Sequence, residues 1–102
     1  MLILSRKALR TYWESYKGAD QPALEQALKS WYREVKTAQW SNANELKQKY
    51  RSASILKNGR VVFNICGNKF RLIAGVNYVT EVVFIKWLGT HAEYDGIDAE
   101  EV

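Results

Sequence analysis

The sequence has few of the residues and segments on which several classes of protein depend. It contains one cysteine, Cys66, which excludes a disulfide framework and a cysteine-rich zinc site. No apolar run approaches the ~20 residues that a membrane span needs. The N-terminus lacks the order of a secretory signal, in which charge precedes a long apolar stretch. We therefore expect a cytoplasmic protein with no membrane partner.

What is present fits one folded domain. The 102 residues are 47% apolar, 25% charged and 13% aromatic, which excludes a disordered chain. A chain of this length buries roughly two-thirds of the surface that its unfolded form exposes, enough for one core. Internal repeats, low-complexity tracts and linkers are absent. We expect a single domain over residues 1–102.

The charges are unevenly distributed along the chain. Fifteen lysines and arginines face eleven aspartates and glutamates, for a net charge of +4. The last ten residues contain five of the acids and no base, so residues 1–92 carry fifteen bases and six acids, a net +9. A compact body of that charge attracts polyanions such as nucleic acid. A basic surface kept for solubility is the alternative.

Apolar residues recur every three or four positions in the first half of the chain, as on the buried stripe of a helix. Ser5 can cap the first helix, and Asn42 with Glu45 has the spacing of a capping box. The pattern predicts a short strand at residues 2–4, followed by helices over about 6–16, 22–38 and 43–50.

The second half of the chain is typical of strands joined by turns. Asn58-Gly59 is the signal for a two-residue hairpin turn, and Cys66-Gly67-Asn68 marks a second turn. Helices followed by consecutive strands predict an α+β fold, with the helices on one face of a mostly antiparallel sheet. The expected strands cover about residues 52–57, 61–65, 70–76 and 82–88.

Several cations fall on or beside the predicted strands. Lys69 and Arg71 are two residues apart and should point to one face, while the apolar residues beside them point to the other. Lys86 interrupts an apolar run, where burying an unpaired ammonium would be costly. Lys86 is either merely solvated or, with Lys69 and Arg71, part of a phosphate-binding surface that Arg51 and Arg60 enlarge.

The segment after the last predicted strand holds the only histidine, His91. Histidine is the side chain whose unperturbed titration lies nearest neutral pH, so His91 is a candidate acid/base group or a structural residue of the turn. Tyr94 follows three residues later, and one helical turn would put both on the same side. Cys66 has no nearby base and is expected to be an inert thiol. Glycine-rich phosphate loops and His-Glu-x-x-His pairs are absent.

Four segments resemble the HigB family of toxins, and they follow the family's order over essentially the whole chain. The Asn-x-x-Gly-Asn-x-Phe-Arg and Thr-His-x-Glu-Tyr-Asp elements are specific in combination. The segments are Ser5–Arg10, Tyr50–Ser54, Val62–Leu72 and Thr90–Asp95.

The resemblance implies a RelE-like toxin fold and a toxin that cleaves messenger RNA on the translating ribosome, without a metal or cofactor. It also implies neutralisation by a HigA-type helix-turn-helix antitoxin, with operator DNA contacted only through the toxin–antitoxin complex. The positions that match the family's motifs, and so carry its expected site, are Asn68, Lys69, Arg71, His91 and Tyr94. Lys86 is added from its predicted place on the last strand.

The expected roles follow from the chemistry of RNA cleavage. Arg71 and Lys69 would stabilise charge on the phosphate, with Lys86 either assisting them or serving as an acid/base group. His91 is the first candidate for acid/base catalysis and Tyr94 the second. Asn68 is expected to contact RNA. Two alternatives remain open, a ParE-like inhibitor of DNA gyrase and a non-catalytic RNA-binding module.

Overall fold

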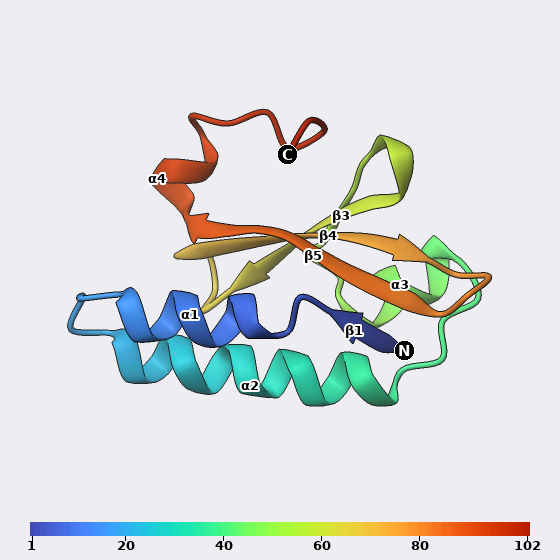
Figure 1. The fold of residues 1–102 in the computed structure, drawn as a ribbon. Coiled ribbons are helices and arrows are strands. Elements are labelled where there is room, and N and C mark those ends of the chain that lie inside the picture. The colour runs from blue at the N-terminus through green and yellow to red at the C-terminus, as the bar shows by residue number, and fades with distance from the viewer.

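A computed structural model describes all of residues 1–102 and confirms the α+β fold (Figure 1). Five strands form one mixed sheet in the order β1-β5-β4-β3-β2. The elements are β1 (Leu2–Leu4), α1 (Lys7–Ser15), α2 (Gln21–Thr37), α3 (Ala43–Lys49), β2 (Ser54–Ile55), the 3-10 turn η1 (Lys57–Gly59), β3 (Arg60–Ile65), β4 (Phe70–Asn77), β5 (Val82–Thr90) and α4 (His91–Tyr94).

The sheet is antiparallel except at one edge, where β1 runs parallel to β5. A β-bulge interrupts the pairing of β4 with β5. Ile73 pairs with Trp87 and Ala74 with Ile85, so Lys86 is the extra residue of β5. A bulge of this kind redirects the side chains that follow it. It places Trp87 and Gly89 on the same face as their partners Ile73 and Arg71.

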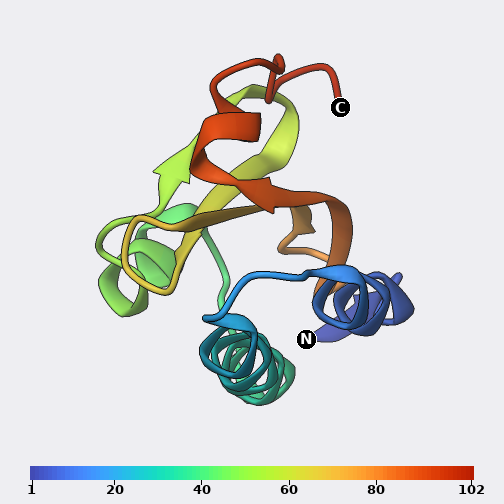
Figure 2. The same ribbon diagram turned by 90° about the vertical axis from the view of Figure 1, so that its left-hand side faces the viewer.

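The two faces of the sheet are covered differently. The long antiparallel helices α1 and α2 lie against one face, and α3 lies on the same side (Figures 1 and 2). The short helix α4 and the C-terminal segment lie over the opposite face, which we call the open face (Figure 2). None of the helices is both long and apolar enough to cross a membrane.

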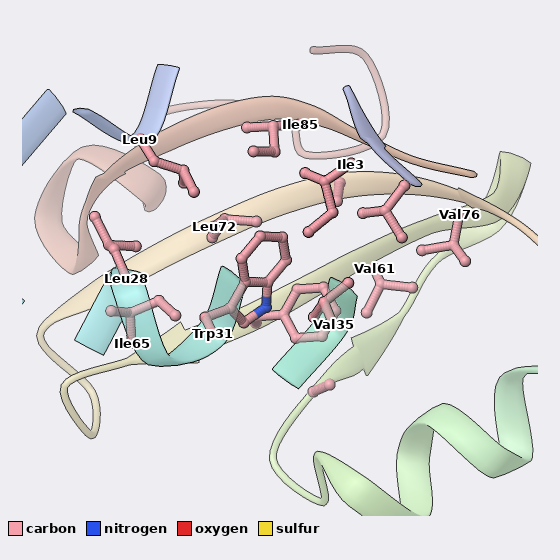
Figure 3. Close-up of a cluster of buried hydrophobic side chains, with 14 of the residues drawn as sticks. Ile3, Leu9, Leu28, Trp31, Val35, Val61, Ile65, Leu72, Val76 and Ile85 are labelled. Atoms are coloured by element: carbon pink, nitrogen blue, oxygen red, sulfur yellow. The ribbon is translucent and has the colours of Figure 1, made fainter. Parts of the chain in front are cut away.

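The core lies between the two long helices and the sheet (Figure 3). One stripe of α2, at helical spacing, is buried completely and includes Leu28, Trp31 and Val35. The ring of Trp31 meets that of Phe63 edge to face at 5.4 Å between centroids. Each such fully buried side chain contributes about 1.5–3 kcal/mol relative to exposure. Trp40, which follows α2, is also buried and packs on Tyr50 at 6.0 Å.

All three helices start within one residue of the predicted positions, but only one predicted capping side chain makes its hydrogen bond. Asn42 accepts a hydrogen bond from the backbone N–H of Glu45 and caps α3 as predicted. The prediction for Ser5 is wrong, because Arg6 holds the N-cap position and Ser5 adopts a left-handed φ of 67°. Asp20 occupies the N-cap position of α2, but its carboxylate makes no capping hydrogen bond and accepts from the Tyr16 hydroxyl instead.

The first predicted hairpin is present, but it is shorter and has a different turn. Only Ser54–Ile55 of the expected segment 52–57 pairs with β3. Lys57–Gly59 forms a 3-10 turn in which Asn58 and Gly59 take φ values of 60° and 71°. Asparagine and glycine tolerate this conformation best, so their sequence signal located the turn correctly even though its length differs.

Candidate active site

Arg71 lies on the open face, near the end of the sheet where β5 passes into α4. Its strand neighbours Phe70 and Leu72 are buried in the core, so the predicted face assignment is confirmed. In the register, Asn64 of β3 and Gly89 of β5 flank it. Its Nη1 donates to the carbonyl oxygens of Asn68 at 3.0 Å and Phe70 at 3.2 Å. These bonds fix the guanidinium and leave its other donors for a ligand.

Tyr94 lies beside this guanidinium. The Cζ atom of Arg71 is 5.8 Å from the centre of the Tyr94 ring, a cation–π distance, and Trp87 lies 6.3 Å from the same ring. The sequence reasoning did not include Trp87. Its place beside Tyr94 depends on the β-bulge, for which the sequence carries no clear signal.

A capping box positions the helix that carries Tyr94. The Thr90 hydroxyl accepts from the backbone N–H of Glu93, and the Glu93 carboxylate accepts from the backbone N–H of Thr90. The spacing Thr-x-x-Glu at residues 90–93 is the sequence signal for this motif, and the sequence analysis missed it. The box starts α4 at His91 and so determines where both His91 and Tyr94 lie.

His91 is exposed at the start of α4, one helical turn from Tyr94 as predicted. Its side chain is 49% exposed, and its Nε2 lies 3.7 Å from Oδ1 of Asp95. The backbone N–H of His91 donates to the carbonyl of Lys69 at 2.9 Å. This bond ties the β5–α4 junction to the turn between β3 and β4, and it brings the Lys69 and His91 backbones together.

The prediction that Lys69 shares a face with Arg71 is wrong. Lys69 belongs to the turn before β4, so strand alternation does not set its direction. Its Nζ reaches Oδ2 of Asp20, in the α1–α2 connection, at 3.4 Å. The Tyr16 hydroxyl donates to the other oxygen of Asp20 at 2.8 Å. The sequence reasoning did not identify Asp20 as a partner for a site lysine.

This contact leads us to predict how the stability of the fold depends on pH. The hydrogen bond from Tyr16 and the ammonium of Lys69 hold the pKa of Asp20 below its usual range. A carboxyl group whose pKa is lower in the folded state stabilises the fold above its ordinary pKa, about 4, and loses that contribution as the pH falls further. We expect Asp20→Asn to lower the melting temperature at pH 7. In thermal melts, the difference in melting temperature between the variant and the parent should become smaller below pH 4. A difference that does not change with pH would show that ionised Asp20 does not stabilise the fold.

The remaining cations on the open face are separated from Arg71. Arg60 pairs in register with Gly75, and Gly75 is four residues along β4 from Arg71. Lys86 bends toward the same region, with its Nζ 4.6 Å from the Phe84 ring centre. Four residues along a strand span about 13 Å, so Arg60 and Lys86 lie roughly that far along the sheet from Arg71. The predicted continuous surface of Lys69, Arg71 and Lys86 is therefore not formed.

The open face between Arg71 and the pair of Arg60 and Lys86 is apolar and covered. Val62 and Ile73 pair across the open face and are 2% and 0% exposed. The C-terminal segment lies on this side of the sheet (Figure 2). Arg60 is tied to this segment, because its Nε donates to the carbonyl of Val102 at 3.1 Å.

Arg51 also lies apart from the site. It follows α3 and lines a shallow polar hollow with Asn44, Lys47 and Gln48. Figures 1 and 2 place α3 on the helical side of the sheet, toward the end opposite α4. The structure thus brings together Arg71, Tyr94 and the backbone of Asn68, with His91 and Lys69 at the margin.

Two further ionisable groups, near the end of the sheet that carries Arg71, are held in their neutral forms. Burial, with Glu93 nearby, raises the pKa of Tyr12 to about 12. Burial also raises the pKa of the Cys66 thiol, which agrees with the predicted inert role. No group of three or more histidine, cysteine, aspartate or glutamate side chains is placed to hold a metal ion.

Comparison with known proteins identifies the family. The sequence model of HigB_toxin, described as the RelE-like toxic component of a toxin-antitoxin system, matches residues 24–97. The chain therefore belongs to the HigB toxin family. A relative named mRNA interferase HigB, from Escherichia coli O6:H1, is 35% identical over 71 residues, which are 68% of this chain and 69% of the relative. The matched range includes Arg71, His91 and Tyr94 of this HigB-family chain.

Proposed function

We propose that this HigB-family toxin is an endoribonuclease that cleaves messenger RNA on the translating ribosome and so arrests growth. The observation that carries the proposal is the Arg71–Tyr94 pair, 5.8 Å apart, at the end of the open face in a RelE-like toxin. The relative's name, mRNA interferase, supports the same reaction. The protein would act in the cytoplasm, where its substrate is translated.

The reaction that suits these side chains is attack by the ribose 2′-hydroxyl on the adjacent phosphorus, with departure of the 5′-oxygen. This route uses a nucleophile within the RNA and does not require a metal ion. The protein must stabilise charge on the phosphate, accept one proton and donate another. Arg71 serves the first task, because hydrogen bonds from Nη1 already fix its guanidinium and its other N–H groups have no partner within the protein. Lys69 would join it once its Asp20 contact opens.

His91 and Tyr94 are the candidates for proton transfer. His91 can accept the 2′-hydroxyl proton, and Asp95, 3.7 Å from Nε2, stabilises the imidazolium that results. The Tyr94 phenol can donate a proton to the leaving oxygen or stack on a base. Lys86 keeps a role only if RNA extends about 13 Å across the open face.

The exposure of the site supports dependence on the ribosome. His91 is 49% and Lys69 65% exposed, so the protein alone holds few groups around an RNA strand. In-line attack requires the 2′-oxygen, the phosphorus and the 5′-oxygen to be aligned, and such alignment supplies a large share of the rate. A ribosome that holds the messenger in a fixed path would provide this alignment.

The test is to map RNA 5′ ends in cells that express the chain, with and without translating ribosomes. We expect new ends inside open reading frames of translated transcripts, and few of them when initiation is blocked. The matched control is the same chain with Arg71→Ala. RNA cuts that persist without translation would contradict the dependence on the ribosome but not the nuclease activity.

The two other functions give different results in the same experiment. A gyrase inhibitor would stop DNA replication first and leave transcript ends unchanged. A non-catalytic RNA-binding protein would lower translation without producing new ends, because charge and stacking suffice for binding. Growth arrest with unchanged transcripts would therefore contradict the nuclease proposal.

A further inference from the structure

A concentration of positive charge outside the candidate active site lies between the two long helices. A groove of about 640 Å³ runs between α1 and α2. Five cations line it, and no acid does. The lining cations are Arg6, Lys7, Arg10, Lys29 and Arg33.

Neighbouring acids neutralise only part of this charge. Arg10 lies 3.6 Å from Glu14, and Lys29 lies 2.7 Å from Glu25. The other three cations make no ion pair with a carboxylate. Arg6 donates to the hydroxyl of Tyr32, Arg33 donates to Ser30, and Lys7 is exposed at the start of α1. The groove thus keeps a net positive charge that only an external anion can balance.

The base of the groove is apolar. Leu9 of α1 and Leu28 of α2 lie beneath it and are only 2% and 0% exposed, so the apolar surface that a partner can reach belongs to the half-buried rings of Trp13 and Tyr32. An apolar base with a cationic rim matches a helix that carries an apolar stripe flanked by acids. Such a helix would place its apolar side chains between α1 and α2 and its carboxylates on the rim.

The aromatic rings do not favour a nucleic acid here. Single-stranded nucleic acid gains much of its affinity by stacking bases on exposed aromatic faces. The ring of Trp13 is covered by the ammonium of Lys29 at 5.5 Å, and that of Tyr32 by Arg6 at 5.4 Å and Lys36 at 5.9 Å. Bases would have to displace these cations, whereas a carboxylate can pair with them in place.

We propose that this groove binds an acidic amphipathic helix of the antitoxin. The family description supplies a partner of that kind, because the chain is the toxic component of a toxin-antitoxin system. The groove is lined by α1 and α2, and these helices lie on the side of the sheet opposite α4 (Figure 2). Arg71 and Tyr94 belong to the open face. Antitoxin binding and RNA cleavage therefore use separate surfaces, and different substitutions should affect each.

The test measures the affinity of the purified toxin for its antitoxin, identified as the protein whose co-expression restores growth. The variant is Lys7→Glu with Arg33→Glu, since neither side chain makes an ion pair or belongs to the candidate active site. Placing like charges opposite each other at an interface costs several kcal/mol, so we expect roughly 10²-fold weaker binding by calorimetry. The control, Lys49→Glu with Lys57→Glu, changes the net charge equally at exposed positions outside the groove and should keep the parent affinity.

Two other outcomes would overturn the proposal. One is antitoxin affinity that stays at the parent value while binding to purified ribosomes is lost, which would make the groove an RNA surface. The other is antitoxin-induced protection from hydrogen exchange that falls on β4 and α4 instead of α1 and α2. The exchange measurement uses the parent chain, so it remains decisive even if the charge-reversed variant does not fold. Both readouts are binding measurements, so a failure of the proposed nuclease activity would leave them unaffected.

Discussion

Replacing Arg71 by alanine should abolish toxicity while leaving the fold intact. Preorganised donors aimed at a developing negative charge are worth roughly 10²–10³ in rate, and Arg71 is the fixed guanidinium of the site. Its side chain hydrogen-bonds only to the carbonyls of Asn68 and Phe70 at the start of β4, and water can replace those bonds. We therefore expect growth to resume on induction and the melting temperature to change little.

The matched control for this variant is Arg33→Ala. Arg33 is an exposed arginine on α2, on the other side of the sheet, and should retain full toxicity when no antitoxin is present. Arg71→Lys separates charge from geometry, because lysine keeps the charge but loses the planar guanidinium, whose Nη1 contacts two carbonyls. We expect it to be intermediate in a cleavage assay on programmed ribosomes. An Arg71→Ala protein that unfolds would show instead that Arg71 is a structural residue.

Strand alternation predicted the face of Arg71 correctly because β4 is regular at that point. Phe70 and Leu72 are both buried in the core, so the residue between them has to face the other way. The turns were also predictable, since Asn58, Gly59 and Gly67 adopt positive φ values that few residue types tolerate. These features depend on a few neighbouring residues, and sequence patterns record such local constraints.

The predicted surface of Lys69, Arg71 and Lys86 does not form, for two separate physical reasons, although Lys86 is exposed as one of its two interpretations expected. Lys69 precedes the first residue of β4, so the turn sets its direction and Asp20, 49 residues away in sequence, pairs with it. Lys86 is the extra residue of a β-bulge, which breaks the two-residue period. Local sequence patterns predict neither the distant partner of Lys69 nor the bulge at Lys86.

The Arg71–Tyr94 pair could be anticipated only as two separate candidates. Their proximity depends on how β5 passes into α4, where the capping box of Thr90 and Glu93 sets the helix start. The Thr-x-x-Glu spacing is readable from the sequence, but the register of β5 against β4 is not. The parallel pairing of β1 with β5 and the cover over Val62 and Ile73 likewise result from long-range packing.

Replacing His91 by glutamine should slow cleavage by roughly 10²–10⁴ if this histidine is the main acid/base group. Glutamine keeps a similar size and some hydrogen bonding. The capping box and the bond from the His91 backbone to Lys69 do not use the imidazole, so α4 should stay in place. The measurement is single-turnover cleavage on programmed ribosomes at saturating toxin, which reports the chemical step without product release.

Three companion variants decide between the acid/base candidates. Tyr94→Phe removes the hydroxyl group but keeps the aromatic ring beside Arg71. A lower cleavage rate with this variant would therefore assign proton transfer, rather than stacking, to Tyr94. Lys86→Met tests a lysine whose Nζ lies over the Phe84 ring, roughly 13 Å along the sheet from Arg71, and we expect the parent rate. Asp95→Asn should reduce the rate less than His91→Gln, because Asp95 acts only through the imidazole 3.7 Å away. A His91→Gln rate close to the parent's, together with a large loss in Tyr94→Phe, would remove His91 from the mechanism. Proton transfer would then be assigned to the tyrosine that the structure places beside Arg71.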